Sequence, residues 1–190
     1  MQSKLISFLA VMVLALSSQF ALADKFAEAR QVFQDAGESA AFFNKSYGYA
    51  LFPGIGKGGI GVGGAYGDGK VFVGGKEVGK TSMTQLSVGF QLGGQVYSQI
   101  IFFEDKRAFD DFSSGNFEFS AQATAVAITA GASAQSSTGG GSSAGASGGQ
   151  KDASTVSAGY NKGMAVFTVA KGGLMYEAAL AGQKYSYEAL

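Results

Sequence analysis

Residues 47–72 have the sequence YGYALFPGIGKGGIGVGGAYGDGKVF, in which glycine recurs at every second or third position over most of the stretch. Glycine inside a helix costs about 1 kcal/mol relative to alanine, so a helix cannot persist through this segment. Strands and tight turns tolerate glycine better. Glycines at alternate positions, such as Gly59, Gly61 and Gly63, leave one face of a strand without side chains. A bare face of this kind suits a strongly coiled sheet or the close approach of a helix.

A second stretch, TSMTQLSVGFQLGGQVYSQIIFFED at residues 81–105, alternates apolar residues with polar or small ones, which is the period of a half-buried strand. The strand and turn signals of the whole chain predict an antiparallel sheet. Strands are expected at residues 49–52, where Pro53 ends the strand, 58–66, 71–73, twice within 81–103, 117–125, near 156–160, 164–170 and 174–181. Turns are expected at Asp68-Gly69, Gly74-Gly75 and Lys171-Gly172-Gly173.

The chain after residue 23 is predicted to begin with a helix, because apolar residues recur there at helical spacing. That apolar stripe consists of Phe26, Ala29, Phe33, Ala36, Ala40 and Phe43. Gly37 is a candidate break in this helix. The opposite face is slightly acidic, which opposes docking onto anionic headgroups. We therefore interpret the stripe as the side that packs on the sheet, with insertion into lipid as the alternative. A second, short helix is expected from Glu104-Asp105 to Gly115.

These elements define an α+β domain in which an amphipathic N-terminal helix packs on a strongly curved, glycine-rich antiparallel β-sheet that can close toward a barrel. Residues 1–23 are predicted to be a signal peptide, because Lys4 precedes an apolar run and Ala21-Leu22-Ala23 fits a small-residue cleavage site. Residues 24–190 are expected to form a single domain, with the Gly/Ser-rich residues 131–150 as a flexible loop. We expect an exported, periplasmic protein that is peripheral to a membrane.

The composition argues against several classes of function. The chain has no histidine and no cysteine, so the commonest metal ligands and the commonest general base are absent. Its 14 lysines and arginines balance its 14 aspartates and glutamates, which gives no bulk attraction for nucleic acid. No nucleophilic side chain has a visible base beside it. We therefore expect a non-catalytic protein with no cofactor, no metal and no nucleic-acid partner.

The stretches at residues 47–72 and 81–105 resemble the SYLF domain family, whose members bind lipid. The resemblance extends over nearly all of the chain after residue 23, with a weaker match in GLMYEAALAG at residues 173–182. It implies a non-catalytic domain that contacts phospholipid and acts in envelope maintenance. Eukaryotic members of the family bind phosphoinositides through a basic helix, and fungal members bind actin. The acidic leading helix of this chain departs from that pattern, so neither ligand is carried over.

Five lysines lie in and around the glycine-rich turns, where Asp68 and Glu77 are the only acidic residues among them. These candidate headgroup-binding residues are Lys45, Lys57, Lys70, Lys76 and Lys80. Each lysine near a membrane surface contributes about 1 kcal/mol of attraction to anionic lipid. Lysines also protect exposed strand edges and keep a protein soluble, which is the alternative explanation for them. We assign anionic phospholipid or a membrane surface as the expected partner.

Two other functions are considered from the sequence. GGKEVGKT at residues 74–81 matches the phosphate-binding pattern GxxxxGK[ST], in which Lys80 would reach the outer phosphates of a nucleotide and Thr81 would bind magnesium. Because a helix must follow that loop and residues 81–94 are typical of a strand, we interpret the match as chance. The glycines of GIGKGG at residues 54–59 likewise continue into a strand. The second alternative is a small outer-membrane β-barrel with a structural role, since the alternating strands would suit eight short crossings.

Overall fold

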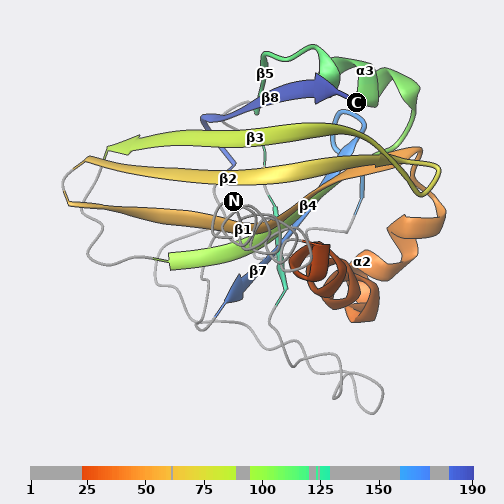
Figure 1. Ribbon diagram of the computed structural model, residues 1–190, viewed down its shortest axis with the longest axis horizontal. Helices are drawn as coiled ribbons and strands as arrows, with labels where there is room; N and C mark the ends of the chain where they lie inside the picture. The colour runs from red at the N-terminus through yellow and green to blue at the C-terminus, as the bar shows by residue number, and fades with distance from the viewer. Residues whose placement is uncertain are drawn as a thin grey trace, which may run out of the picture.

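The computed structural model describes residues 23–60, 62–88, 95–119, 123, 125–128, 159–171 and 180–190. In this part of the chain eight strands form one curled sheet with the order β5-β8-β3-β2-β1-β4-β7-β6 (Figure 1). The strands are β1 (Gly48–Ile60), β2 (Val62–Val73), β3 (Lys76–Val88), β4 (Gln95–Phe103), β5 (Phe117–Glu118), β6 (Val126–Ile128), β7 (Met164–Lys171) and β8 (Gln183–Ala189). Neighbouring strands are antiparallel except β6 and β7, which are parallel. The sheet has the form of a half-barrel, so the predicted α+β class and strong curvature are confirmed.

The N-terminal helix packs on one face of this sheet, which confirms the predicted core role of its apolar stripe. Residues 23–35 form the helix, followed by α2 (Gly37–Ala40) and the 3₁₀ helix η1 (Ala41–Asn44). Phe26 and Phe33 are buried against the sheet together with Leu51 and Phe102. The break falls at Ala36, whose backbone is extended, directly before the expected Gly37. The Ser39 hydroxyl donates to the Phe33 carbonyl at 2.6 Å and so ties α2 back to the longer helix.

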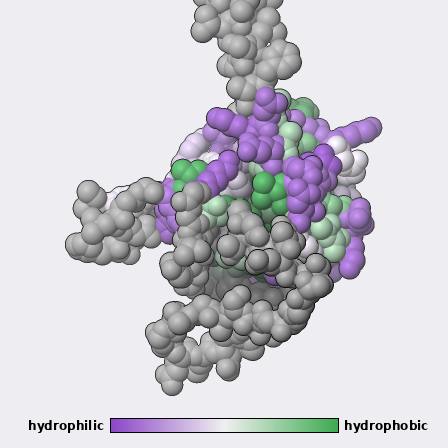
Figure 2. Space-filling model, turned by 90° about the horizontal axis from the view of Figure 1, so that it is seen from below, coloured by the Kyte–Doolittle hydropathy of each residue, from purple (hydrophilic) through white to green (hydrophobic). Residues whose placement is uncertain are grey.

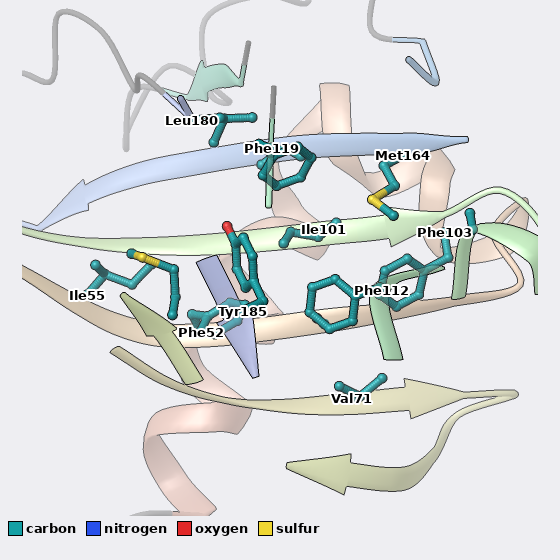
Figure 3. Close-up of a cluster of buried hydrophobic side chains, with 14 of the residues drawn as sticks. Phe52, Ile55, Val71, Ile101, Phe103, Phe112, Phe119, Met164, Leu180 and Tyr185 are labelled. Atoms are coloured by element: carbon teal, nitrogen blue, oxygen red, sulfur yellow. The ribbon is translucent and has the colours of Figure 1, made fainter. Parts of the chain in front are cut away.

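The opposite face of the sheet holds a second apolar core, drawn in Figure 3, which is covered by α3 (Lys106–Ser113). Asp105 caps this helix, because its side chain accepts a hydrogen bond from the Ala108 amide at 2.8 Å. Phe112 projects from α3 onto Phe103 of β4, with ring centroids 5.0 Å apart. The predicted short helix is therefore confirmed. The two cores make the fold three layers deep: helix, sheet and α3.

The glycine-rich stretch folds differently from the expected order of strands. β1 runs through Pro53, where an interruption of the ladder on both sides of the strand accommodates a residue without an amide proton. The expected strand at 58–66 is also wrong, because Ile60 pairs with Val62 and the chain reverses between them. Asp68-Gly69 is likewise no turn but lies inside β2. The turn at Gly74-Gly75 is confirmed, with φ of 57° and 79° at the two glycines.

The remaining predicted strands are confirmed in three cases, while others are wrong or lie outside the described residues. β7 confirms the strand expected at 164–170, and the two strands expected within 81–103 are β3 and β4. Tyr160 is not in a strand, and the rest of the segment 156–160 lies mostly outside the described residues. The segment 174–181 also lies mostly outside them, as do the predicted signal peptide, apart from residue 23, and the loop at 131–150. The last strand, β8, was not predicted, and it pairs with β3.

Candidate functional site

Four of the five predicted lysines lie at the end of the sheet where β1 begins and β2 turns into β3. Lys45 follows η1, and Lys76 and Lys80 are exposed on β3. Lys70 pairs in register with Lys80, but its ammonium group is partly neutralised by Glu77 at 2.8 Å. Lys70 also lies over the ring of Phe26, 5.1 Å from the centroid. The lysines at this end therefore form a loose cationic group in which one member also has a structural role.

Lys57 lies at the other end of the sheet. It stands nine residues beyond Gly48 along β1, a distance of roughly 30 Å at 3.3 Å per residue. Its register partners are Ala65 on β2 and Gln95 on β4. The structure therefore brings Lys45, Lys70, Lys76 and Lys80 toward one end and does not bring Lys57 to them.

The GGKEVGKT segment is a hairpin followed by a strand, as its interpretation as a chance match requires. Gly74 and Gly75 form the turn, and β3 continues without interruption from Lys76 to Val88. The Thr81 hydroxyl is already committed, because it donates to the Ser186 carbonyl at 2.7 Å across the β3–β8 pair. No helix N-terminus follows the glycines, so the backbone amides cannot form a phosphate cradle. GIGKGG likewise lies within β1.

An apolar surface that was not recognised in the sequence lies on the helix-covered face of the sheet. Tyr66 of β2, Gly56 of β1 and Val96 of β4 are direct register partners, so they form one row across three strands. Leu86 of β3 stands one row further along, opposite Gly64. Tyr66, Leu86 and Val96 are 54%, 86% and 45% exposed. We call these three residues the apolar row.

Glycines keep the surface around the apolar row flat. A Cβ atom added to Gly56 or to Gly58 would meet nothing within 4 Å, so both glycines face open space. The same face of the sheet is covered by the N-terminal helix at the level of Leu51 and Ile100. In Figure 1, β1, β2 and β3 extend well past the helices toward the left of the view. The apolar row lies on this part of the face, which no helix among the described residues covers.

Few charges surround the apolar row among the described residues. Lys171 of β7 pairs with Val96 and is exposed, so a cation continues the row on one side. On the other side the Tyr66 hydroxyl donates to the Asp68 carboxylate at 2.6 Å. That hydrogen bond and the negative charge of Asp68 raise the pKa of the Tyr66 phenol above 10.0. The surface that Figure 2 shows has the same mixed character, with apolar side chains exposed between polar ones.

A cavity of about 440 Å³ opens on the other face of the sheet, between α3, β5 and the start of β7. Apolar side chains form most of its wall: Phe117, Phe119, Ala123, Met164, Val166 and Leu180. Charged side chains stand at its edge: Arg107, Asp111, Glu118 and Lys162. The cavity thus has an apolar wall and a polar mouth. Figure 3 shows Leu180, Phe119 and Met164 in succession along β7, on one side of the buried cluster.

A layer of buried, hydrogen-bonded polar side chains lies in the interior, formed by Tyr97, Gln99, Gln183 and Tyr185. The Gln99 amide donates to the Tyr185 hydroxyl at 2.7 Å, and the Gln183 amide donates to the Tyr97 hydroxyl at 3.3 Å. Burial raises the pKa of Tyr97 to about 12 and holds the pKa of Tyr185 well above its usual value. Both phenols therefore remain neutral hydrogen-bond donors at physiological pH. We assign this layer a structural role, because its hydroxyls are bound to neighbouring side chains.

The described residues contain no helix of the length and apolarity that crossing a bilayer requires. They also contain no cluster of three or more acidic side chains suited to a metal ion. The candidate site therefore consists of the apolar row, the lysines and the cavity.

Comparison with known families identifies the class of domain to which this fold belongs. The model of the Ysc84 family, described as Las17-binding protein actin regulator, matches residues 84–187, which is more than half of the chain. The chain therefore belongs to the Ysc84 family, the SYLF domain family, and the predicted resemblance is confirmed. The matched segment contains β4, α3 and β7 together with Leu86 and Val96.

The chain is also similar to a curated protein, beta cell expansion factor A of Aeromonas veronii. The two are 29% identical over 157 residues, which cover 82% of this chain and 51% of the relative. The chain therefore spans about half the length of that relative.

Proposed function

We propose that the protein is exported and binds peripherally, without catalysis, to membranes that contain anionic phospholipid. Membership of the Ysc84 family supports a lipid-binding role. The signal-peptide pattern of residues 1–23 supports export to the periplasm. A role in envelope maintenance is part of the proposal and rests on the resemblance to the SYLF family. The observation that carries the proposal is the apolar row of Tyr66, Leu86 and Val96.

The apolar row has the properties of a membrane-contacting surface. Soluble proteins expose single apolar residues freely, but a contiguous apolar patch rimmed by polar residues marks an interaction site. Here Leu86 and Tyr66 stand on the neighbouring strands β3 and β2, and Val96 stands on β4 with only Gly56 of β1 between it and Tyr66. The glycines on this face let the sheet approach a flat partner. Moving a leucine side chain from water into an apolar medium is worth about 2 kcal/mol. Lys171 beside Val96 adds attraction to anionic headgroups.

The N-terminal helix does not compete for this role, because its apolar stripe is occupied. Phe33 is fully buried and Phe26 nearly so, and both pack against the sheet. Exposing them to a bilayer would leave the sheet face uncovered. We therefore assign membrane contact to the apolar row and a structural role to the helix.

The test is flotation of the protein with phosphatidylcholine vesicles that contain increasing fractions of phosphatidylglycerol. The variant Leu86→Ser/Val96→Ser should reduce the bound fraction at least tenfold, because two apolar side chains no longer enter the bilayer. Both residues are exposed, so the fold should remain intact by circular dichroism. The matched control is Val32→Ser, since Val32 is 37% exposed on the N-terminal helix.

Val32→Ser should float like the wild type. Equal loss of binding in Val32→Ser would assign the contact to the helix instead. Wild-type flotation by the double variant would show that the apolar row is not the contact. Failure of the wild-type protein to float at any phosphatidylglycerol content would overturn the function itself.

A further inference from the structure

We propose that the cavity between α3, β5 and β7 binds a single hydrocarbon chain that ends in an anionic group, as in a fatty acid or a lysophospholipid. This inference rests on the proposed lipid-binding function and adds a second, separate ligand site. The cavity volume of about 440 Å³ lies toward the lower end of the range for ligand pockets, which is roughly 300–1,000 Å³. A space of this size favours one chain over a complete two-chain lipid.

The wall of the cavity has the chemistry of a hydrocarbon site. Its lining comes from separate parts of the chain: Phe117 and Phe119 around β5, Met164 and Val166 from β7, and Leu180 before β8. These side chains also belong to, or pack against, the core that Figure 3 shows, so the cavity is an extension of the apolar interior toward the surface. Apolar surface of this kind gains free energy when a hydrocarbon chain displaces water from it.

The charges at the mouth favour an anionic group. Arg107 lies 3.5 Å from Asp111 and 3.7 Å from Asp105, and Glu118 lies 3.5 Å from Lys184. The two acidic side chains at the mouth therefore already have cationic neighbours. Among the described residues no ion pair compensates Lys162. One positive charge thus remains available beside the apolar wall.

The backbone holds Lys162 at this position at a conformational cost. Its φ is 53°, a left-handed conformation that is unfavourable for a residue with a Cβ. Asn161 and Met164 close the turn with two backbone hydrogen bonds of 2.8 and 3.1 Å. Gly163 lies so close to α3 that an added Cβ would be 2.9 Å from Nη2 of Arg107. The turn is therefore fixed against α3, with Lys162 at its tip.

The inference is tested with the full-length protein by titration calorimetry, at ligand concentrations below micelle formation. Oleate is the probe, oleyl alcohol is the matched uncharged chain, and oleoyl lysophosphatidylglycerol distinguishes a phosphate head from a carboxylate. Oleate and the lysolipid should bind, and the alcohol should bind several-fold more weakly. Preference for the lysolipid over oleate would identify a lysophospholipid as the ligand, and the reverse would identify a fatty acid.

Two variants locate the ligand. Ala123→Phe should abolish binding of all three probes, because the new ring occupies the cavity. Lys162→Asn should weaken oleate about three- to five-fold and leave the alcohol unchanged, because asparagine tolerates the left-handed backbone but has no charge. Lys162→Arg should bind oleate like the wild type. Should Ala123→Phe fail to fold, the comparison of Lys162→Asn with Lys162→Arg still tests whether the anionic group binds at the mouth of the cavity.

The outcomes separate this inference from the proposed function. Two results together would establish two sites. Leu86→Ser/Val96→Ser should still bind oleate but fail to float with vesicles, and Ala123→Phe should still float but fail to bind oleate. Vesicle flotation by a wild-type protein that binds no probe would overturn the cavity inference alone. Oleate binding that neither Ala123→Phe nor Lys162→Asn reduces would also overturn it.

Discussion

Gly69 of β2 lies directly against the ring of Phe52 of β1. A Cβ atom on Gly69 would be 2.7 Å from two carbons of that ring and 2.9 Å from the Leu51 carbonyl oxygen. Gly67 has the same relationship to Ile55, whose side chain would be 2.6 Å from an added Cβ. The side chains of β1 therefore fold over the bare face of β2. This close approach lets the sheet curl into a half-barrel around the core of Figure 3.

The first prediction follows from this contact. Gly69→Ala should lower the free energy of unfolding by about 1–3 kcal/mol, because the added methyl group must displace the Phe52 ring or the β1 backbone. Gly56→Ala is the matched control, since nothing lies within 4 Å of a Cβ at Gly56. The control should change stability by no more than about 0.5 kcal/mol. Urea unfolding measures both, and equal stability of the two variants would contradict the proposed cause of the curl.

The same contact explains which parts of the fold could be predicted from the sequence. Glycine spacing predicted a curved sheet, and helical spacing of Phe26 and Phe33 predicted the packed helix. Gly74-Gly75 was predicted correctly as a turn because both residues need a positive φ. Asp68-Gly69 has the same local signature of a turn. Gly69 instead allows the Phe52 ring to pack against β2. Phe52 lies seventeen positions earlier, so the local sequence around Gly69 gives no sign of this contact.

The candidate site shows a similar limit. The lysines could be found singly, but the register of β1 with β2 separates Lys57 from the others. Leu86 belongs to an alternating apolar run, and alternation alone does not say whether that side of the strand is covered. Its exposure depends on where the N-terminal helix ends across the sheet. The apolar row and the cavity are therefore properties of tertiary structure.

The second prediction separates the lysines by their position. Lys57 pairs with Ala65, which is buried in the core on the opposite face, so Lys57 points away from the apolar row. Lys171→Gln should weaken binding to phosphatidylglycerol-containing vesicles about fivefold, because Lys171 lies beside Val96 and a cation near the surface contributes about 1 kcal/mol. Lys76→Gln/Lys80→Gln removes two charges at the opposite end of the sheet and should still change binding little. Flotation at several salt concentrations measures both, since screening weakens contacts between exposed charges.

Two results would contradict this assignment. A larger loss in Lys76→Gln/Lys80→Gln than in Lys171→Gln would place the membrane at the end where β2 turns into β3. Binding that is insensitive to salt and to all three lysine substitutions would remove the electrostatic contribution, and the apolar row alone would then account for affinity.

The third prediction concerns stability at high pH. Burial raises the pKa of Tyr97 to about 12, while the hydrogen bond from Gln183 lowers it slightly. A tyrosine in the unfolded chain titrates near 10, so the unfolded state loses its proton first as the pH rises. The free energy of unfolding should therefore stay constant up to about pH 10 and then fall between pH 10 and 12. The titration of Tyr97 alone should account for about 3 kcal/mol of that fall. Tyr97→Phe removes this titrating group and should show a shallower decline in urea unfolding across that window. An identical decline in both proteins would mean that Tyr97 titrates normally in the folded state.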